Sequence, residues 1–208
     1  MNLNDIWEQV PADYFSTGVK NNILQKIWHL NKLQAVIKAI SQDCVPSLLD
    51  IGSADGSFIN RLEKHTHCSH LIAVDPYFPP LKFGAKHFSN TQYIQGDSHN
   101  LPIKSHSIPV ITILETLEHV RDPLQTLIEL KRVLKKNGYI IVEMDSGNFL
   151  FQMVWFFWKK LGKGKVWNNA HLTSFNVQLL EQLFSQAKLK IVNKTYFNLN
   201  MGICYKLS

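Results

Sequence analysis

A short apolar run that passes directly into a glycine-rich turn constrains this chain more than any other stretch. Residues 48–51, LLDI, suit a buried parallel strand, and residues 52–56, GSADG, form a turn before apolar positions recur at helical spacing in residues 57–62. Glycines at 52 and 56 tolerate positive φ angles and let a ligand approach the backbone. The first turn of the helix then offers free N–H groups to that ligand. The pattern predicts an α/β chain with a binding site at the end of this strand.

The spacing of the small residues distinguishes between two kinds of ligand. A dinucleotide fingerprint needs three glycines, but on that frame the chain offers Gly52, Ala54 and Ser57, so a nicotinamide cofactor fits poorly. With Asp50 at the strand tip, Gly52, Ala54 and Gly56 resemble the first motif of class I S-adenosylmethionine-dependent methyltransferases, although alanine replaces the commoner middle glycine. A ligand-free turn of an α/β protein remains the alternative.

Two further strand tips carry acidic residues. Asp75, followed by Pro76, ends the apolar run 71–75 and lies 23 positions beyond Gly52, the distance at which a βαβ unit brings a carboxylate to the hydroxyls of a ribose. The alternative is that Asp75 only ends a strand and starts a turn. A third strand, residues 92–95, leads to Asp97 and Ser98, and the resemblance implies that this tip reads the adenine amino group.

The remaining pattern predicts a doubly wound, mostly parallel sheet with helices on both faces. A fourth strand, 108–114, is interrupted by Pro109, a helix starts at Asp122-Pro123 and ends at Asn137-Gly138, and a fifth strand covers 139–144. A final helix, 176–187, and strands at 189–197 and 202–207 complete seven strands. The resemblance implies that the last strand inserts antiparallel.

The predicted organisation is a single domain with four parts. Residues 1–44 form a helical N-terminal cap, with apolar residues at helical spacing over 21–41, and residues 45–145 form the cofactor-binding core. Residues 146–170 form a lid-like insertion, and residues 171–208 form the terminal helix and hairpin.

Within the insertion, residues 149–158, FLFQMVWFFW, are apolar nearly all round, but ten residues are about half of what spans a bilayer. Basic residues and glycines follow up to residue 165. Three interpretations stay open for 149–165: a lid over an apolar acceptor, plain core, and a contact with a membrane surface or a partner.

Acidic and imidazole side chains cluster after the fourth strand. If the chain is helical there, spacings of three and four place Glu115, Glu118 and His119 on one face, with His171 as a fourth member. Such a set can act as a general base or hold a divalent cation, and the resemblance to ubiquinone-biosynthesis O-methyltransferases extends to this Glu-x-x-Glu-His pattern. The structural alternative is that the carboxylates favour a helix start and His119 packs on the sheet. We assign no metal ligand.

Composition, charge and cysteine number argue against several classes of protein. A net charge of +6 over 208 residues without a block of Lys and Arg gives no nucleic-acid stripe. Three scattered cysteines argue against a disulfide scaffold, and the N-terminus lacks the pattern of a secretory signal, which makes the cytoplasm the simplest compartment. His65, His67, Cys68 and His70 lie away from the expected ligand crevice and suit a solvated loop rather than a metal site.

The resemblance therefore implies a methyltransferase that uses S-adenosylmethionine to methylate an oxygen, nitrogen or carbon of a small acceptor, and the aromatic stretch suggests an acceptor with apolar character. The alternatives are an inactive nucleotide-binding protein of the same fold and, less favoured, an NAD-dependent oxidoreductase. The cofactor-binding residues expected from the resemblance are Asp50, Gly52, Ser53, Ala54, Asp55, Gly56, Asp75, Pro76, Asp97, Ser98 and Leu114.

Overall fold

The computed structural model of the chain describes residues 11, 23–40, 45–66, 68–161 and 171–208. Most of the predicted N-terminal cap before residue 23, and the part of the predicted insertion from 162 to 170, lie outside these ranges. The described helices are α3 (Ile23–Ala39), α4 (Ser57–Thr66), α5 (Phe78–His87), α6 (Pro123–Val133), α7 (Phe149–Leu161) and α8 (Val177–Gln186), with a 3₁₀ turn η1 (Leu117–His119). The strands are β1 (Leu48–Ile51), β2 (Leu71–Asp75), β3 (Thr91–Gln95), β4 (Ile108–Leu114), β5 (Leu134–Asp145), β6 (Ile191–Phe197) and β7 (Gly202–Leu207).

The strands form one seven-stranded sheet in the order β3-β2-β1-β4-β5-β7-β6. The five strands from β3 to β5 are parallel, whereas β7 lies antiparallel between β5 and β6. The predicted doubly wound sheet with an inserted antiparallel last strand is confirmed. Because β1 to β5 run the same way, their carboxyl ends share one edge of the sheet.

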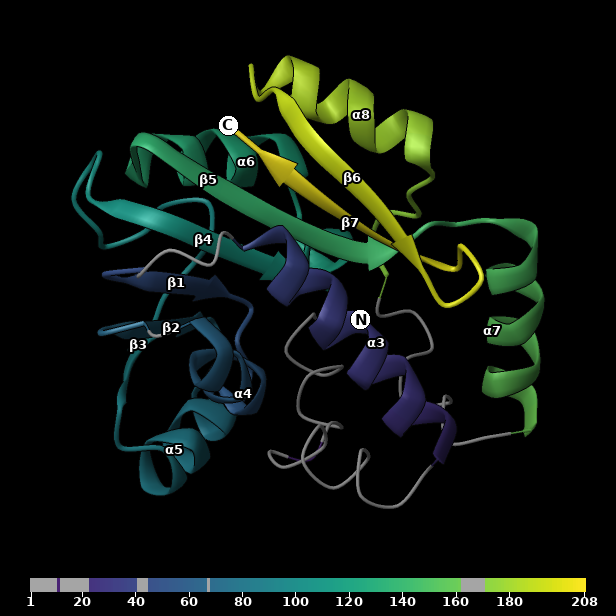
Figure 1. Ribbon diagram of the computed structural model, residues 1–208, viewed down its shortest axis with the longest axis horizontal. Helices are drawn as coiled ribbons and strands as arrows, with labels where there is room; N and C mark the ends of the chain where they lie inside the picture. The colour runs from purple at the N-terminus through teal and green to yellow at the C-terminus, as the bar shows by residue number, and fades with distance from the viewer. Residues whose placement is uncertain (1–10, 12–22, 41–44, 67, 162–170) are drawn as a thin grey trace.

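Helices cover both faces of the sheet (Figure 1). Helices α6 and α8 pack on one face, where Leu127, Leu130, Leu180 and Phe184 are buried against the strands. Helices α3 and α4 pack on the other face through a second cluster that includes Val36 and Ile59. The sheet is therefore the middle layer of three, and loops at its carboxyl edge are left to form a site.

Local sequence signals explain most of the element boundaries. Asp122 begins α6 because its side chain accepts a hydrogen bond from the Gln125 N–H at 2.9 Å. Asn176 caps α8 in the same way through the Leu179 N–H at 2.8 Å. Pro109 coincides with an irregularity in the pairing of β4 with β5, as expected for a residue that cannot donate a backbone hydrogen bond.

Two predicted details are wrong. Helix α6 ends at Val133 rather than at Asn137-Gly138, because residues 134–138 already extend β5. The N-terminal half of α3 does not bury its apolar residues: Ile23 and Ile27 are 67% and 47% exposed. The buried face of this helix instead includes a lysine, Lys32, which is 4% exposed.

Candidate active site

A cavity of about 350 Å³ lies at the carboxyl ends of β1, β2 and β4, as the strand tips predict. We call it the first cavity. Ten of the eleven residues predicted to bind the cofactor line it, namely Asp50, Gly52, Ser53, Ala54, Asp55, Asp75, Pro76, Asp97, Ser98 and Leu114.

The glycine turn gives this cavity its floor. Gly52 has a φ of 70°, and a Cβ at this position would lie 2.3 Å from the Thr116 Oγ1 atom. Gly56 has a φ of 71°, but the space for its Cβ is occupied by the ring of Tyr93, so the need for glycine at 56 comes from packing and backbone conformation. The Ser53 Oγ atom is buried without a hydrogen-bond partner in the described residues, and a polar ligand in the first cavity would satisfy it.

Asp75 joins the tip of β2 to the glycine turn. One carboxylate oxygen accepts a hydrogen bond from the Ala54 N–H at 2.9 Å, and the other accepts one from the Tyr77 N–H at 2.8 Å. Burial raises the pKa of Asp75 above its usual value, although these two hydrogen bonds oppose the shift. Asp75 therefore shapes the turn as well as facing the cavity.

Asp50, at the tip of β1, is almost fully buried and accepts a hydrogen bond from the Thr112 hydroxyl at 2.6 Å. Burial raises the pKa of Asp50 to about 7, against the opposing effects of the Thr112 hydrogen bond and of Lys32. A cationic ligand in the first cavity would favour the ionised form of this carboxyl group.

Asp97 lies in the loop after β3, and its side chain is 67% exposed. Burial acts to raise the pKa of Asp97, but hydrogen bonds from the backbone and the ring of His99, together with nearby positive charge, outweigh it and lower the pKa. Asp97 is thus an available acceptor at the rim of the first cavity.

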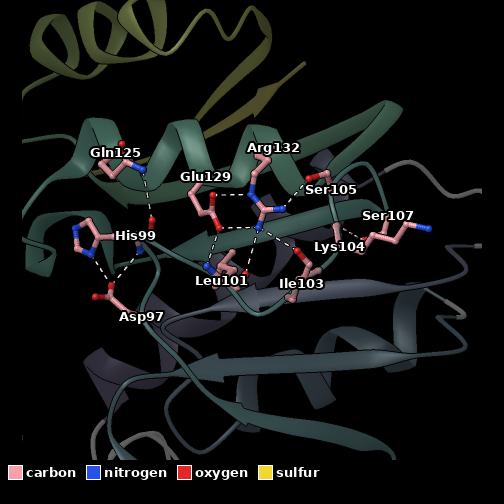
Figure 2. A network of polar contacts seen from close by, with 10 residues as sticks. All are labelled: Asp97, His99, Leu101, Ile103, Lys104, Ser105, Ser107, Gln125, Glu129 and Arg132. Carbon is pink, nitrogen blue, oxygen red and sulfur yellow. Dashed lines mark hydrogen bonds and ion pairs between the residues drawn. The ribbon is translucent and has the colours of Figure 1, made fainter.

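The loop that carries Asp97 is held by α6 (Figure 2). Glu129 accepts a hydrogen bond from the Leu101 N–H at 2.7 Å, and Arg132 donates to the carbonyl oxygens of Leu101 and Ile103 at 3.2 and 3.0 Å. The same two side chains pair with each other at 2.7 Å. These contacts therefore attach the loop that carries Asp97 to helix α6.

A second cavity of about 230 Å³ adjoins the first. The two cavities share His29, Glu115 and His119 as lining residues, so they meet along a common wall. The second cavity has an aromatic wall, which comprises Trp28, Phe151, Trp155 and Trp158. Ring centroids in this wall are 6.2 Å apart for Trp28 and Phe151 and 5.8 Å apart for Phe151 and Trp155.

Glu118, His119 and His171 form a compact set in the second cavity. One ligand-type atom from each lies within 4.8 Å of the others. The set forms because the Leu172 N–H and the Thr173 N–H donate to the Glu118 carbonyl oxygen at 2.9 and 3.2 Å, which fixes the His171 segment against η1. The structure thus brings together three of the four predicted catalytic residues.

Glu118 is the buried carboxyl group of this set. The residue is 3% exposed, and its Oε2 atom has no hydrogen-bond partner among the described residues. Burial raises the pKa of Glu118 to about 8, and the nearby Glu115 adds to the shift. Its Oε1 atom lies 3.9 Å from the His119 Nε2 atom, so a proton could be shared between carboxyl and imidazole through a small displacement.

Glu115 departs from the predicted arrangement. The chain is not helical at this point, because Glu115 has a φ of 45° and η1 begins only at Leu117, so Glu115 does not share a helix face with Glu118. Its carboxylate instead lies 3.1 Å from the Lys32 Nζ atom and accepts a hydrogen bond from the Trp28 indole at 3.0 Å. Burial would raise the pKa of Glu115, but Lys32 outweighs it and lowers the pKa to about 2.

Several residues of the site were not predicted from the sequence. Lys32 also lies 3.1 Å from Glu143 of β5, and its own pKa is raised because the two carboxylates outweigh the effect of burial. His29 lines both cavities, and burial lowers its pKa to about 4, so this ring is neutral. Asp145, at the end of β5, lines the second cavity, and burial followed by the charge of Glu118 raises its pKa to about 7.

One signal in the sequence could have pointed to Lys32. This lysine lies four residues after Trp28 and four before Val36, in register with the buried face of α3, where a charged residue needs a buried partner. Glu143 gave no comparable signal, because it occurs within an apolar strand that is easily taken as plain core.

Comparison with known proteins identifies a matching family and several relatives. A family described as "Methyltransferase domain" matches residues 49–142. A demethylmenaquinone methyltransferase from Staphylococcus saprophyticus is 31% identical over 144 residues, which cover 67% of this chain and 60% of that protein. A malonyl-[acyl-carrier protein] O-methyltransferase from Marinomonas is 28% identical over 115 residues, which cover 54% of this chain and 42% of that protein.

A solved structure of a methyltransferase that depends on S-adenosylmethionine, from Aquifex aeolicus, superimposes with a TM-score of 0.69 over 100% of this chain and 98% of that one. At 13% identity this likeness shows the fold alone. The chain spans about two fifths to three fifths of the length of the two curated relatives described above. The residues that the family matches, 49–142, include the glycine turn and the strand tips that line the first cavity.

Proposed function

Because the chain belongs to the class I S-adenosylmethionine-dependent methyltransferases, we propose that it methylates a small, apolar acceptor that binds in the second cavity. One observation carries this proposal: a cavity with the features of a cofactor site shares a wall with an aromatic cavity that contains a carboxyl–imidazole set. Because the two cavities adjoin at these shared lining residues, the methyl group of a donor in the first cavity would face a nucleophile in the second.

The first cavity suits S-adenosylmethionine. Gly52 provides the positive φ that the turn beside this cavity requires, and the Ser53 Oγ atom, which has no hydrogen-bond partner among the described residues, is available for a polar group of the ligand. We assign Asp75 to the ribose hydroxyls and Asp97 to the adenine, because they lie at the tips of β2 and β3. The buried carboxyl of Asp50 can offset positive charge on the cofactor.

The cofactor supplies an activated methyl group on a sulfonium centre, whose thioether leaves without the help of an acid. The protein must therefore align the acceptor and remove a proton from it. We assign the proton transfer to Glu118, assisted by His119 and His171. A carboxyl group with a pKa of about 8 suits the removal of a proton from a weakly acidic hydroxyl near neutral pH.

The aromatic wall indicates the kind of acceptor. Trp28, Phe151 and Trp155 offer ring faces and edges to a flat, apolar molecule, and Trp155 also stacks against His171 with 5.6 Å between ring centroids. The relative from Staphylococcus is named for demethylmenaquinone, which has a planar ring of this kind. We propose a hydroxylated aromatic or quinol ring as the acceptor, methylated at an oxygen or at a ring carbon activated by an ionised hydroxyl, with the displaced proton of the acceptor passing to Glu118.

Cofactor binding can be tested by calorimetry with S-adenosylhomocysteine and with NAD. We expect binding of the former and far weaker or no binding of the latter. Asp75→Ala should weaken binding of S-adenosylhomocysteine about 5- to 150-fold, because loss of a buried hydrogen-bond acceptor costs about 1–3 kcal/mol. Lys64→Ala, an exposed change on α4, is the control. Equal binding of S-adenosylhomocysteine by Asp75→Ala and the parent would refute the assignment of Asp75.

Turnover can be tested with labelled S-adenosylmethionine and a panel of hydroxylated aromatic and quinol acceptors. Glu118→Gln should lower the rate by about 10²- to 10⁴-fold, as expected for loss of a general base, while leaving S-adenosylhomocysteine binding unchanged. Cofactor binding without methylation of any acceptor, in the panel or in cell extract, would favour an inactive binding protein of the same fold.

The compact geometry of Glu118, His119 and His171 also supports a second candidate, a divalent cation that lowers the pKa of the acceptor hydroxyl. A chelator separates the two. Loss of turnover that is restored by a divalent cation would establish the metal route. Turnover that is indifferent to the chelator but is lowered by Glu118→Gln would establish the base.

A further inference from the structure

Helix α7 is apolar on two faces. Its inner face contributes Phe151, Trp155 and Trp158 to the second cavity, at spacings of four and three residues. Its outer face carries Phe149, Phe156 and Phe157, which are 81%, 55% and 53% exposed. Met153 and Val154 of the same helix are also 43% and 47% exposed.

Such a helix would normally be covered on both sides. An exposed helix in a globular protein usually turns a polar face to solvent, and a helix that is apolar all round is usually buried. Among the described residues, nothing covers the outer face of α7. Five neighbouring apolar side chains left open in this way mark a contact surface rather than a scattered few.

The charged residues in and after α7 indicate which kind of surface its outer face would contact. The sequence contains no acidic residue between Asp145 and Glu181, whereas lysines occur at 159, 160, 163 and 165. The Lys160 ammonium lies 5.5 Å from the centre of the Phe156 ring, so positive charge and aromatic surface adjoin directly. Aromatic side chains combined with lysine and a lack of acidic residues suit the surface of an anionic lipid bilayer.

The dimensions of α7 limit how it can meet a bilayer. It has 13 residues, about 20 Å at 1.5 Å per residue, which is less than the hydrocarbon core of a membrane. In the described part of the chain, no helix has the length and apolar character needed to cross a membrane. Helix α7 would therefore lie in the plane of the interface.

The second cavity and the exposed side of α7 share a residue. Val154 lines this cavity and is itself 47% exposed, so one residue belongs both to the cavity and to the open side of the helix. We propose that the outer face of α7 docks on an anionic lipid bilayer and places the mouth of the second cavity at its surface. The further step, that a lipid-soluble acceptor enters from the bilayer, rests on the proposed function.

Docking can be measured by sedimentation with vesicles, without cofactor or acceptor. Vesicles of phosphatidylcholine and phosphatidylglycerol should bind the protein, vesicles of phosphatidylcholine alone should bind it much more weakly, and added salt should weaken the binding. The double variant Phe156→Ser with Phe157→Ser should lose at least about tenfold in affinity, because it removes two aromatic anchors. Phe78→Ser on α5 is the matched control, since Phe78 is 54% exposed.

A second pair of variants tests the charge. Lys160→Glu should weaken binding to the anionic vesicles, whereas Lys82→Glu, a reversal at an exposed site on α5, should leave it nearly unchanged. Circular dichroism shows whether each variant remains folded.

The proposal is overturned if the parent does not bind anionic vesicles, or if the α7 variants bind as tightly as their controls. Sedimentation equilibrium tests the competing occupant: a dimer that the Phe156→Ser and Phe157→Ser changes dissociate, with no vesicle binding, would assign the face to a second copy of the chain. Since neither measurement needs turnover, failure of docking is distinguishable from failure of the methyltransferase proposal.

Discussion

The buried Lys32 should contribute more to stability than any surface charge on α3. Its ammonium lies 3.1 Å from both Glu115 and Glu143, and its side chain is 5% exposed. In Lys32→Met the methionine fills a similar volume, but two carboxyl groups lose their cationic partner. The cost of removing one partner from a buried ion pair is about 3–5 kcal/mol.

The pKa of Glu115 gives an independent magnitude. It is lowered from 4.5 to about 2, chiefly because Lys32 outweighs the effect of burial, and at 1.36 kcal/mol per pKa unit this corresponds to about 3 kcal/mol at pH 7. Because the folded-state pKa is depressed, this contribution is present above pH 4.5 and is lost as the pH falls through about 2. Burial raises the pKa of Glu143 to about 8 despite Lys32, so Glu143 holds a proton at pH 7 and adds less.

We therefore expect Lys32→Met to lose about 3 kcal/mol of unfolding free energy at pH 7, measured by urea denaturation followed by circular dichroism. In a domain of this size the melting temperature should fall by about 10 °C. Lys38→Met, an exposed change on the same helix, should cost less than about 0.5 kcal/mol.

A double variant isolates the ion pair from general packing. Glu115→Gln in the Lys32→Met background removes the unpaired charge and should restore at least about 1 kcal/mol, since residues in contact couple by about 0.5–3 kcal/mol. If Lys32→Met is as stable as Lys38→Met, or if Glu115→Gln restores no unfolding free energy, then the ion pairs of Lys32 with Glu115 and Glu143 do not hold α3 to the sheet.

Two further predictions concern the turn and the buried carboxyl groups. Gly52→Ala should reduce S-adenosylhomocysteine binding in calorimetry by at least about tenfold, because the φ of 70° strains alanine and the new Cβ would lie 2.3 Å from Thr116 Oγ1; unchanged affinity would contradict the role of this turn. Burial raises the pKa values of Glu118 and Glu143 to about 8, so the stability that each group contributes below pH 4.5 is lost as the pH rises toward 8. Urea denaturation should show the unliganded protein about 3 kcal/mol less stable at pH 8 than at pH 6.5, and equal stability at both values would show that the pKa values of these groups are not raised.

The sheet and the first cavity were predictable because each depends on local pattern. Apolar runs ending in Asp50 and Asp75 identify strands and their tips, and parallel strands necessarily bring those tips to one edge. The positive φ of Gly52 follows from the same reasoning, since a strand that turns at once into a helix needs such a residue.

The carboxyl–imidazole set was only partly predictable. The spacing argument assumed that the chain is helical directly after β4. In the structure Glu115 has a positive φ, and the 3₁₀ turn η1 begins only at Leu117. The structure confirms the proximity of His119 and His171, but the backbone hydrogen bonds that produce it join residues more than 50 positions apart along the chain, from Glu118 to Leu172 and Thr173. No local pattern encodes such a contact.

The buried charges were missed for a different reason. The apolar residues 23, 27 and 30 dominate the pattern of α3, yet they remain exposed, and Lys32 turns inward because its partners lie on β4 and β5. Which face a helix buries depends on what it packs against, and this information is distributed over the rest of the fold.

The position of β7 has a consequence for how the chain folds. Among the described strands β6 pairs with β7 alone, so β6 is connected to the parallel strands through the pairing of β7 with β5. The β6–β7 pair closes a short loop, whereas β5 and β7 meet across about 60 residues, and short loops close far faster than long ones. We therefore expect the hairpin to form first and to dock as a unit, which makes completion of the sheet at β5 a late step of folding and Tyr205, buried at that junction, a late reporter of it.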